Sequence, residues 1–258
     1  MSILESILER KRKEVEEARR ALPMEQLKAR VPATETMRPF IRALHPNGMS
    51  IIAEIKKASP SRGVLIQNFD HIRLAKECER GGACALSVLT DRHHFQGESR
   101  FIREIKEAVS LPILRKDFIV DEYQVFESRV IGADAILLIM KALTPERARS
   151  LLELARSIGL DVLVETHTAA EVALANSIGA DLIGVNNRDL ATFEVSLSRS
   201  FELGRLIRPG ATAVSESGIR SSADVRALRD AGFQAVLVGE RIVTDRNPSE
   251  AIRRLAGN

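Results

Sequence analysis

Eight short apolar runs recur along this chain of 258 residues, and the sequence between consecutive runs is long enough for one helix each time. Apolar strands that alternate with amphipathic helices predict repeated βαβ units and a parallel sheet. Eight such units within about 250 residues match a (β/α)8 barrel, or TIM barrel, which carries its chemistry at the carboxyl ends of its strands. The predicted strands are Ser50–Ile55, Ala85–Leu89, Pro112–Leu114, Ala135–Met140, Val162–Val164, Leu182–Val185, Ala211–Val214 and Ala235–Val238.

Residues 1–49 precede the first run, and we expect them to form an N-terminal helical extension of one barrel domain that spans residues 1–258. Ser2 and Glu5 are spaced as in a capping box, and Pro23 separates a first helix from a short second one over 24–30. Such an extension could plug one end of the barrel or cover the active site. The residues alone leave both alternatives open.

The composition argues against a nucleic-acid partner. The net charge is +3 and the pI is near 9.0, but aromatic residues are only 4% and Trp is absent, which leaves few side chains for base stacking. Lys and Arg are interspersed with acids over residues 9–14, a pattern typical of a solvated helix face. We therefore expect a small anionic substrate and no nucleic acid.

Charged residues interrupt the N-terminus, so no secretory leader is predicted, and no apolar run approaches the roughly 18 residues of a membrane span. Cys78 and Cys84 form no CxxC pair, which favours buried, reduced thiols. We expect a cytoplasmic protein that makes no membrane contact. We also expect a monomer, because no large apolar surface stripe is evident.

Capping residues mark the ends of the predicted helices. Thr144 before Pro145, Thr168, and Asn247 before Pro248 are typical N-terminal caps. Glycines close several of the predicted helices, where a left-handed residue is favoured. These glycines are Gly81, Gly132, Gly159, Gly179 and Gly232.

Charged residues lie at the ends of most odd-numbered runs, whereas the even-numbered runs share a Gly-containing entry such as Gly132-Ala133-Asp134. Barrel interiors are filled by layers that odd and even strands contribute alternately. We predict that the uppermost layer comes from the odd strands and forms the floor of an active site. Its ionisable members are Glu54, Lys56, Lys116, Glu165 and Glu216.

Lys116 and Glu165 are the first candidates for proton transfer. Strand alternation directs each to the same face as the apolar residue two positions earlier. A lysine and a carboxylate that face one cavity tune each other's pKa values, which suits acid–base chemistry. Glu54 and Lys56 share a face in the same way. Lys56 fits an anion anchor or a proton donor, and the alternative is that the two residues form a structural ion pair at the rim.

Two further signals follow the later strands. Asn186 and Arg188 offer donors for carboxylate or hydroxyl oxygens, although these residues could equally cap their own turn. Gly-containing turns follow the seventh and eighth runs, at Ser217-Gly218 and Gly239-Glu240, where barrels commonly bind phosphate. Glycine allows backbone N–H groups to approach phosphate closely, so these turns favour a phosphate site.

The residues indicate neither a metal nor a redox cofactor. His93 and His94 lack carboxylates or cysteines at ligand spacing, so we expect a surface loop there. The chain has no Ser-His-Asp signature and no GxGxxG fingerprint. We expect no metal and no cofactor.

Several phrases closely resemble the indole-3-glycerol-phosphate synthase family, in order along the chain. They are Ala53–Ser61, Ser87–Asp91, Leu114–Phe118, Gly184–Leu190 and Ser215–Ile219. The resemblance implies a barrel with an N-terminal helical cover and the activity of a carboxy-lyase in tryptophan biosynthesis. The implied reaction is ring closure, decarboxylation and dehydration of 1-(2-carboxyphenylamino)-1-deoxyribulose 5-phosphate to indole-3-glycerol phosphate.

The resemblance also implies roles at matching positions. Lys116 would be the general acid at the substrate ketone, and Lys56 would hold the substrate carboxylate or act as an acid in dehydration. Glu165 would stabilise positive charge or act as a base, and Glu54 would assist proton transfer. The residues that would position the substrate are Asn186, Arg188 and Glu216. Those that would enclose its aromatic ring are Ser59, Pro60, Phe95, Phe118, Leu137 and Leu190.

The same resemblance implies that phosphate is bound by backbone groups of Ser217, Gly218, Gly239 and Glu240. Glu240 departs from the small residue that we expect in some members of the family. Its negative side chain must therefore point away from a bound phosphate.

Two alternative functions stay open. Another sugar-phosphate barrel, related to phosphoribosylanthranilate isomerase, would use a Cys and an Asp at strand ends, whereas the first run here is closed by Glu54 and Lys56. A phosphate-ligand sensor with a degenerate site would tolerate the loss of Lys116 and Glu165.

Overall fold

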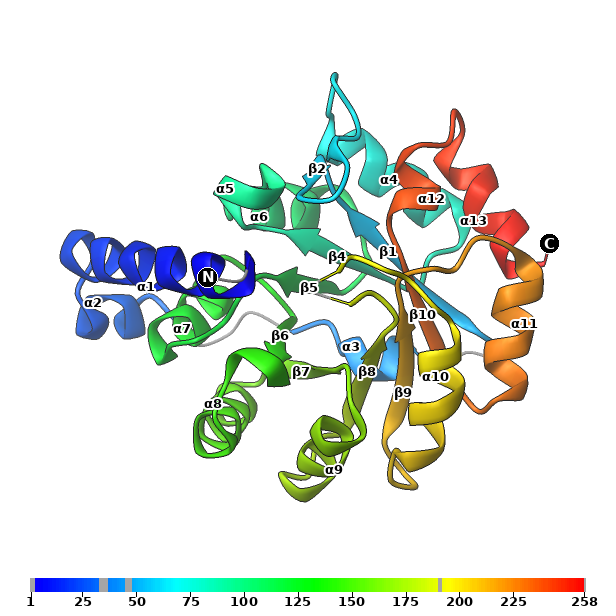
Figure 1. Cartoon of the computed structure of the whole chain (residues 1–258). Helices are drawn as coiled ribbons and strands as arrows, with labels where there is room; N and C mark the ends of the chain where they lie inside the picture. The colour runs from blue at the N-terminus through cyan, green and yellow to red at the C-terminus, as the bar shows by residue number, and fades with distance from the viewer. Residues whose placement is uncertain (1–2, 33–36, 45–47, 190–191, 258) are drawn as a thin grey trace.

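Eight parallel strands close into a barrel in the computed structural model, which describes residues 3–32, 37–44, 48–189 and 192–257 (Figure 1). The strands follow one another around the barrel in sequence order, and the last pairs with the first. They are β1 (Ser50–Ile55), β4 (Ala85–Leu89), β5 (Ile113–Lys116), β6 (Ala135–Ile139), β7 (Asp161–Thr166), β8 (Leu182–Asn186), β9 (Thr212–Glu216) and β10 (Ala235–Val238). The predicted TIM barrel and its eight strands are confirmed, with boundaries that differ by one or two residues.

Helices surround the barrel, and at least one follows each strand (Figure 1). The longer ones are α4 (His71–Gly81), α6 (Arg100–Ala108), α7 (Glu122–Val130), α8 (Pro145–Ser157), α9 (Ala169–Ser177), α10 (Ser198–Leu203), α11 (Ser222–Asp230) and α13 (Pro248–Ala256). Single turns are α5 (Arg92–Phe95), α12 (Glu240–Val243), η1 (Met140–Ala142) and η2 (Gly204–Leu206). A two-stranded hairpin, β2 (Ala58–Ser59) with β3 (Gly63–Val64), follows β1.

The predicted N-terminal caps are confirmed, and one predicted helix end is wrong. The side chains of Thr144, Thr168 and Asn247 each accept a hydrogen bond from the backbone N–H three residues later. Gly81 is the last residue of α4, and the left-handed cap that follows it is Gly82, with a φ of 91°, and not Gly81. Gly81 lies inside the helix, where a side chain would collide with the backbone of α13. The other predicted glycines do adopt positive φ: Gly132, Gly159, Gly179 and Gly232.

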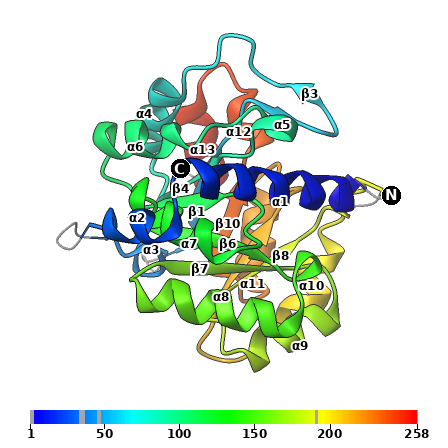
Figure 2. The ribbon, with the colours of Figure 1, turned by 90° about the vertical axis from the view of Figure 1, so that its left-hand side faces the viewer.

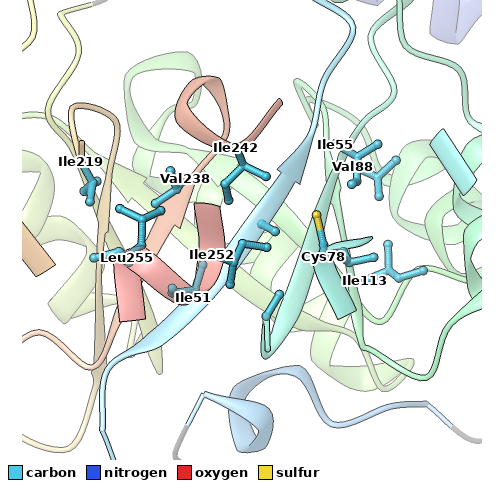
Figure 3. Packing of buried hydrophobic residues seen from close by; sticks show 14 of the residues in the cluster. Ile51, Ile55, Cys78, Val88, Ile113, Ile219, Val238, Ile242, Ile252 and Leu255 are labelled. Carbon is cyan, nitrogen blue, oxygen red and sulfur yellow. The ribbon is translucent and has the colours of Figure 1, made fainter. Parts of the chain in front are cut away.

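The largest apolar cluster lies between the strands and the surrounding helices. Figure 3 shows Ile51 and Ile55 of β1 in this layer, together with Cys78 of α4 and Ile252 of α13. These four side chains are at most 2% exposed. Burial of an aliphatic side chain of this size contributes about 1.5–3 kcal/mol, so this layer holds the helices on the barrel.

The N-terminal extension contacts both ends of the barrel. Helix α3 (Phe40–Ala43) supplies Phe40, which packs with Leu44 against the apolar interior of the barrel and plugs one end. Helices α1 (Ile3–Ala21) and α2 (Met24–Ala29) lie beside α7, and the first turn of α1 is directed toward the barrel (Figures 1 and 2). The plug and the cover that the sequence left as alternatives are therefore both present. Ser2, the cap predicted for α1, lies outside the described residues.

A buried lysine anchors α1 and corrects the expectation of a fully solvated face over residues 9–14. Lys11 is only 4% exposed. Its Nζ lies 3.1 Å from Asp91 Oδ2 and 2.9 Å from Asp117 Oδ1, and it donates to Glu14 at 2.7 Å. The two aspartates raise the pKa of Lys11 above its ordinary value, although burial opposes the charge.

Two other expectations about single residues need correction. His93 and His94 lie in the one-turn helix α5 and not in an irregular loop. Cys78 is buried as expected, whereas Cys84 is only partly buried. In the described part of the chain, no helix combines the length and the apolar character needed to cross a membrane.

We predict that Lys11→Met lowers the free energy of unfolding by about 3 kcal/mol, because it leaves two buried carboxylates without their shared cation. Lys13→Met is the matched control on the same helix, since Lys13 makes only an exposed pair with Glu9 and should change stability by less than about 1 kcal/mol. Urea unfolding followed by circular dichroism measures both. Equal losses in the two variants would contradict the anchoring role.

Candidate active site

A cavity of about 830 Å³ lies at the carboxyl ends of the strands, a size typical of small-molecule sites. Strand ends form its floor, and the β2–β3 hairpin, the turns after β8, β9 and β10, and the start of α1 form its walls. Every predicted site residue in the described part of the chain lines this cavity. Leu190 lies outside the described residues.

The floor of the cavity is built around one buried ammonium group. Lys116, at the end of β5, donates to Glu165 Oε2 at 2.9 Å and to Glu216 Oε2 at 2.6 Å. The two carboxylates close β7 and β9, so the three groups come from odd-numbered strands of the barrel. The predicted charged layer is therefore present at the expected depth.

Glu54 and Lys56 form a second charged pair in the same floor. Both side chains point to one face of β1, as strand alternation predicts, and Lys56 Nζ lies 2.5 Å from Glu54 Oε2. Glu54 is 7% exposed, and its charge also acts on Lys116. Three carboxylates and two ammonium groups thus share this region.

Burial and charge act in opposite directions on this cluster. Burial disfavours the ammonium of Lys116, but Glu165 and Glu216 raise its pKa above the ordinary value. Burial also disfavours the carboxylate of Glu165, but Lys116 and His167 lower its pKa to about 2. Burial, with repulsion from Glu165 and Glu54, raises the pKa of Glu216 to about 7 despite Lys116. Their surroundings therefore shift the pKa values of these two carboxyls in opposite directions.

Two glycines leave room for these acids. A Cβ at Gly184 of β8 would collide with Glu216 Oε1, and a Cβ at Gly239 would collide with Glu54 Oε2. Both glycines belong to even-numbered positions of the barrel, opposite the long side chains of the odd strands. The absence of a side chain at these two glycines thus leaves the space that the acids of the odd strands occupy.

The segment after β8 contains both features that the sequence left as alternatives. Asn186 donates to Glu165 Oε1 at 3.1 Å, so it contacts the acid–base cluster directly. Asn187 instead donates to the carbonyls of Glu216 and Ser217, both at 3.0 Å, and holds the neighbouring turn. Asn186 Oδ1 also accepts a hydrogen bond of 3.0 Å from the Arg188 N–H, so Asn186 both contacts the cluster and caps the turn, whereas Asn187 is a turn-forming residue.

The turn after β9 has an unusual backbone. Ser217 has a φ of 67° and Gly218 a φ of 83°, so two consecutive residues are left-handed. Such successive positive φ values bring the backbone close to the cavity that both residues line. Ser217 is one of few non-glycine residues in this conformation, which costs of order 1–3 kcal/mol and is typical of functional sites.

Glu240 is held by two arginines at the rim. Its Oε1 lies 2.9 Å from Arg62 Nη2, and its Oε2 lies 3.9 Å from Arg188 Nη2. Arg62 belongs to the β2–β3 hairpin and Arg188 to the segment after β8. The carboxylate therefore joins three loops of the mouth.

The remaining predicted residues form an apolar wall. The rings of Phe95 and Phe118 are tilted relative to each other with centroids 6.3 Å apart, and Leu137 of β6 lines the same cavity. Ser59 and Pro60 of the hairpin complete this side. The wall is suited to a planar apolar group.

Several residues that line or support the cavity were not found from the sequence. Ile3, Leu4 and Ile7 of α1 line it, because the extension folds back over the mouth. Their helical period was visible, but the surface they cover was not. His167, which lies beside Glu165, was also missed. No group of three His, Cys, Asp or Glu side chains that could hold a metal occurs among the described residues.

We predict that Glu216→Gln gains free energy of unfolding relative to wild type when the pH is raised from 5 to 8. A raised pKa means that the folded state binds the proton more tightly, so the stability that this group contributes is lost as pH rises from about 4.5 through 7. The Gln variant lacks this loss, so its stability relative to wild type should increase by about 2–3 kcal/mol between the two pH values. Urea unfolding measures it, with exposed Glu202→Gln as the control. An equal effect at both pH values would contradict the prediction.

Comparison with known proteins agrees with this geometry. The sequence model of the family described as indole-3-glycerol phosphate synthase matches residues 4–255. Indole-3-glycerol phosphate synthases of Chlorobium phaeovibrioides and Syntrophobacter fumaroxidans are 52% and 47% identical, over 93% and 98% of this chain and 94% and 97% of theirs. A crystal structure of 3-hexulose-6-phosphate synthase superimposes with a TM-score of 0.66 at 16% identity, covering 81% of this chain and 99% of that one, which shows the fold alone. The chain belongs to the indole-3-glycerol phosphate synthase family.

Proposed function

We propose that Lys116, Lys56 and the surrounding carboxylates carry out the reaction of this family at the mouth of the barrel. As a family member, the chain is a carboxy-lyase of tryptophan biosynthesis (EC 4.1.1.48). Its substrate is 1-(2-carboxyphenylamino)-1-deoxyribulose 5-phosphate, and its products are indole-3-glycerol phosphate, carbon dioxide and water. The observation that carries the assignment of roles is the contact of one buried ammonium with two carboxylates on the cavity floor.

Lys116 is the general acid of ring closure. As the aromatic carbon that bears the carboxylate attacks the ketone, the ketone oxygen gains a proton from the Lys116 ammonium and becomes a hydroxyl. Glu165 and Glu216 keep this lysine charged in the free enzyme. Glu165 stabilises the positive charge that develops on the substrate nitrogen. A positioned proton transfer of this kind contributes on the order of 10²–10⁴-fold.

Lys56 and Glu54 act on the steps that follow. Lys56 pairs with the substrate carboxylate until the bond to the ring carbon breaks and carbon dioxide leaves, and the bonding electrons return to the ring. The hydroxyl then leaves as water with a proton from Lys56, and the loss of a ring proton to a carboxylate restores the aromatic system. Glu54, which lies 2.5 Å from Lys56 Nζ, is the carboxylate that takes up this ring proton, and it then passes the proton to Lys56.

Different regions of the cavity bind different parts of the substrate. Backbone groups of Ser217, Gly218, Gly239 and Glu240 bind phosphate, and the Glu240 side chain pairs with Arg62 and Arg188 instead. Asn186, Arg188 and Glu216 hold the polar middle of the molecule. The wall of Ser59, Pro60, Phe95, Phe118 and Leu137 receives its aromatic ring.

The enzyme acts on a small phosphorylated molecule as a monomeric, single-domain protein of the cytoplasm, without nucleic acid or membrane. The experiment that tests the function supplies the purified protein with the carboxyphenylamino-deoxyribulose phosphate and follows indole absorbance, with no metal or nucleotide added. Turnover is the expected result. A well-folded protein that produces no indole product would contradict the proposed function.

We predict that Lys116→Ala lowers kcat by about 10²–10⁴-fold, because the acid at the ketone is lost. Lys57→Ala is the matched control: Lys57 follows Lys56, so alternation directs its side chain to the other face, and it is not among the described residues that line the cavity. Steady-state kinetics of the two variants should differ in kcat by at least tenfold. An unchanged rate in Lys116→Ala would remove Lys116 from the acid role.

A further inference from the structure

A buried histidine lies next to the acid–base cluster. His167 directly follows β7, two residues beyond Glu165, and its ring lies beside the Glu165 carboxylate. It is 7% exposed and does not belong to the described residues that line the cavity. Its Nε2 lies 3.4 Å from Glu165 Oε1, and its Nδ1 lies 3.4 Å from Glu171 Oε2. The imidazole ring is therefore enclosed between two carboxylates.

Neither ring nitrogen of His167 makes a hydrogen bond within the described part of the chain. Buried polar atoms without a partner are rare, and each costs about 1–3 kcal/mol. A separation of 3.4 Å is slightly longer than a strong hydrogen bond, and contacts at active sites commonly tighten when the substrate binds. The two carboxylates are therefore the hydrogen-bond acceptors that lie nearest to the two ring nitrogens.

Glu171 fixes the ring from the side away from the catalytic cluster. It lies in the first turn of α9, where the Thr168 side chain caps the helix by accepting a hydrogen bond from the Glu171 N–H. Glu171 Oε2 also accepts a hydrogen bond of 2.7 Å from the backbone N–H of His167. One carboxylate thus contacts both the backbone and the ring of the histidine, and it is itself held on a capped helix.

The other contacts of Glu165 explain why such support is needed. Asn186 donates to Oε1, whereas Lys116 is the hydrogen-bond donor to Oε2. In the proposed reaction Lys116 gives up a proton to the substrate, and its attraction for Glu165 then falls. His167 contacts the same carboxylate without touching the cavity, so its contact persists through that step.

We propose that His167, held by Glu171, is a positioning residue that keeps the Glu165 carboxylate in place while Lys116 donates its proton to the substrate. The inference rests on the proposed function, because it assigns Glu165 and Lys116 their roles in that reaction. It adds a row of three contacting side chains, Glu171, His167 and Glu165, behind the floor of the active site.

Steady-state kinetics test the positioning role. His167→Phe keeps a planar ring but removes both nitrogens, and it should lower kcat by about 10–100-fold with KM unchanged within about twofold, because a misplaced catalytic group costs up to about 10²-fold. His167→Gln keeps a hydrogen-bond donor in the side chain. It should therefore recover at least a third of the loss in log kcat that His167→Phe shows. His71→Phe is the matched control, since His71 pairs with Glu104 at 2.6 Å on the outside of the barrel. Equal kcat values in wild type and His167→Phe would overturn the proposal.

A double-mutant cycle separates action through Glu165 from a general structural role. If His167 acts through Glu165, then His167→Phe should change kcat by less than about twofold in the Glu165→Gln background. A further loss of tenfold or more in that background would overturn the proposal, because the histidine would then act independently of Glu165.

A spectroscopic measurement keeps the inference testable without turnover. The ¹⁵N chemical shifts of the His167 ring, assigned from their absence in His167→Phe or His167→Gln, should change in Glu165→Gln and in Glu171→Gln but not in Glu104→Gln. A His167 signal that does not respond to Glu165→Gln would overturn the inference. A wild-type protein without turnover would contradict the proposed function alone, because the spectrum still decides whether His167 is coupled to Glu165.

Discussion

The structure of the site depends on one buried cation, the ammonium group of Lys116. An ammonium withdrawn from water costs several kcal/mol unless opposite charges and hydrogen bonds surround it. Glu165 and Glu216 supply both within 3 Å from two other strands. Burial and repulsion from Glu165 leave Glu216 with a raised pKa, whereas Lys116 and His167 lower the pKa of Glu165. Two chemically identical acids thus have pKa values shifted in opposite directions by their surroundings.

The barrel makes this cluster possible through alternation. Long charged side chains of odd strands meet at one level, and the even strands must be small there to leave space. Gly184 and Gly239 fill that requirement, since any side chain would collide with Glu216 or Glu54. The active-site floor is therefore a packing layer of the barrel whose members are charged.

The sequence predicted those features that depend on local pattern. Strand alternation and the order of eight runs were sufficient to place Lys116, Glu165 and Glu216 in one layer. Lys11 was not predictable, because a lysine within a charged helical run is usually solvated, and only the fold brings Asp91 and Asp117 to it. His167 was missed for the same reason, since its neighbour Glu171 carries a signal only for a helix start.

The anchor of α1 bears on how the mouth of the barrel opens. Asp117 follows Lys116 directly, and it contacts Lys11 of α1, Arg115 and the Thr90 hydroxyl. Lifting α1 from the barrel would leave Asp117 and Asp91 without their shared cation in a buried setting, at a cost of several kcal/mol. The exposed Arg62–Glu240 pair at the rim costs at most about 1 kcal/mol to break. The Arg62–Glu240 pair at the mouth therefore requires less energy to break than the contacts of Lys11 that hold α1 on the barrel.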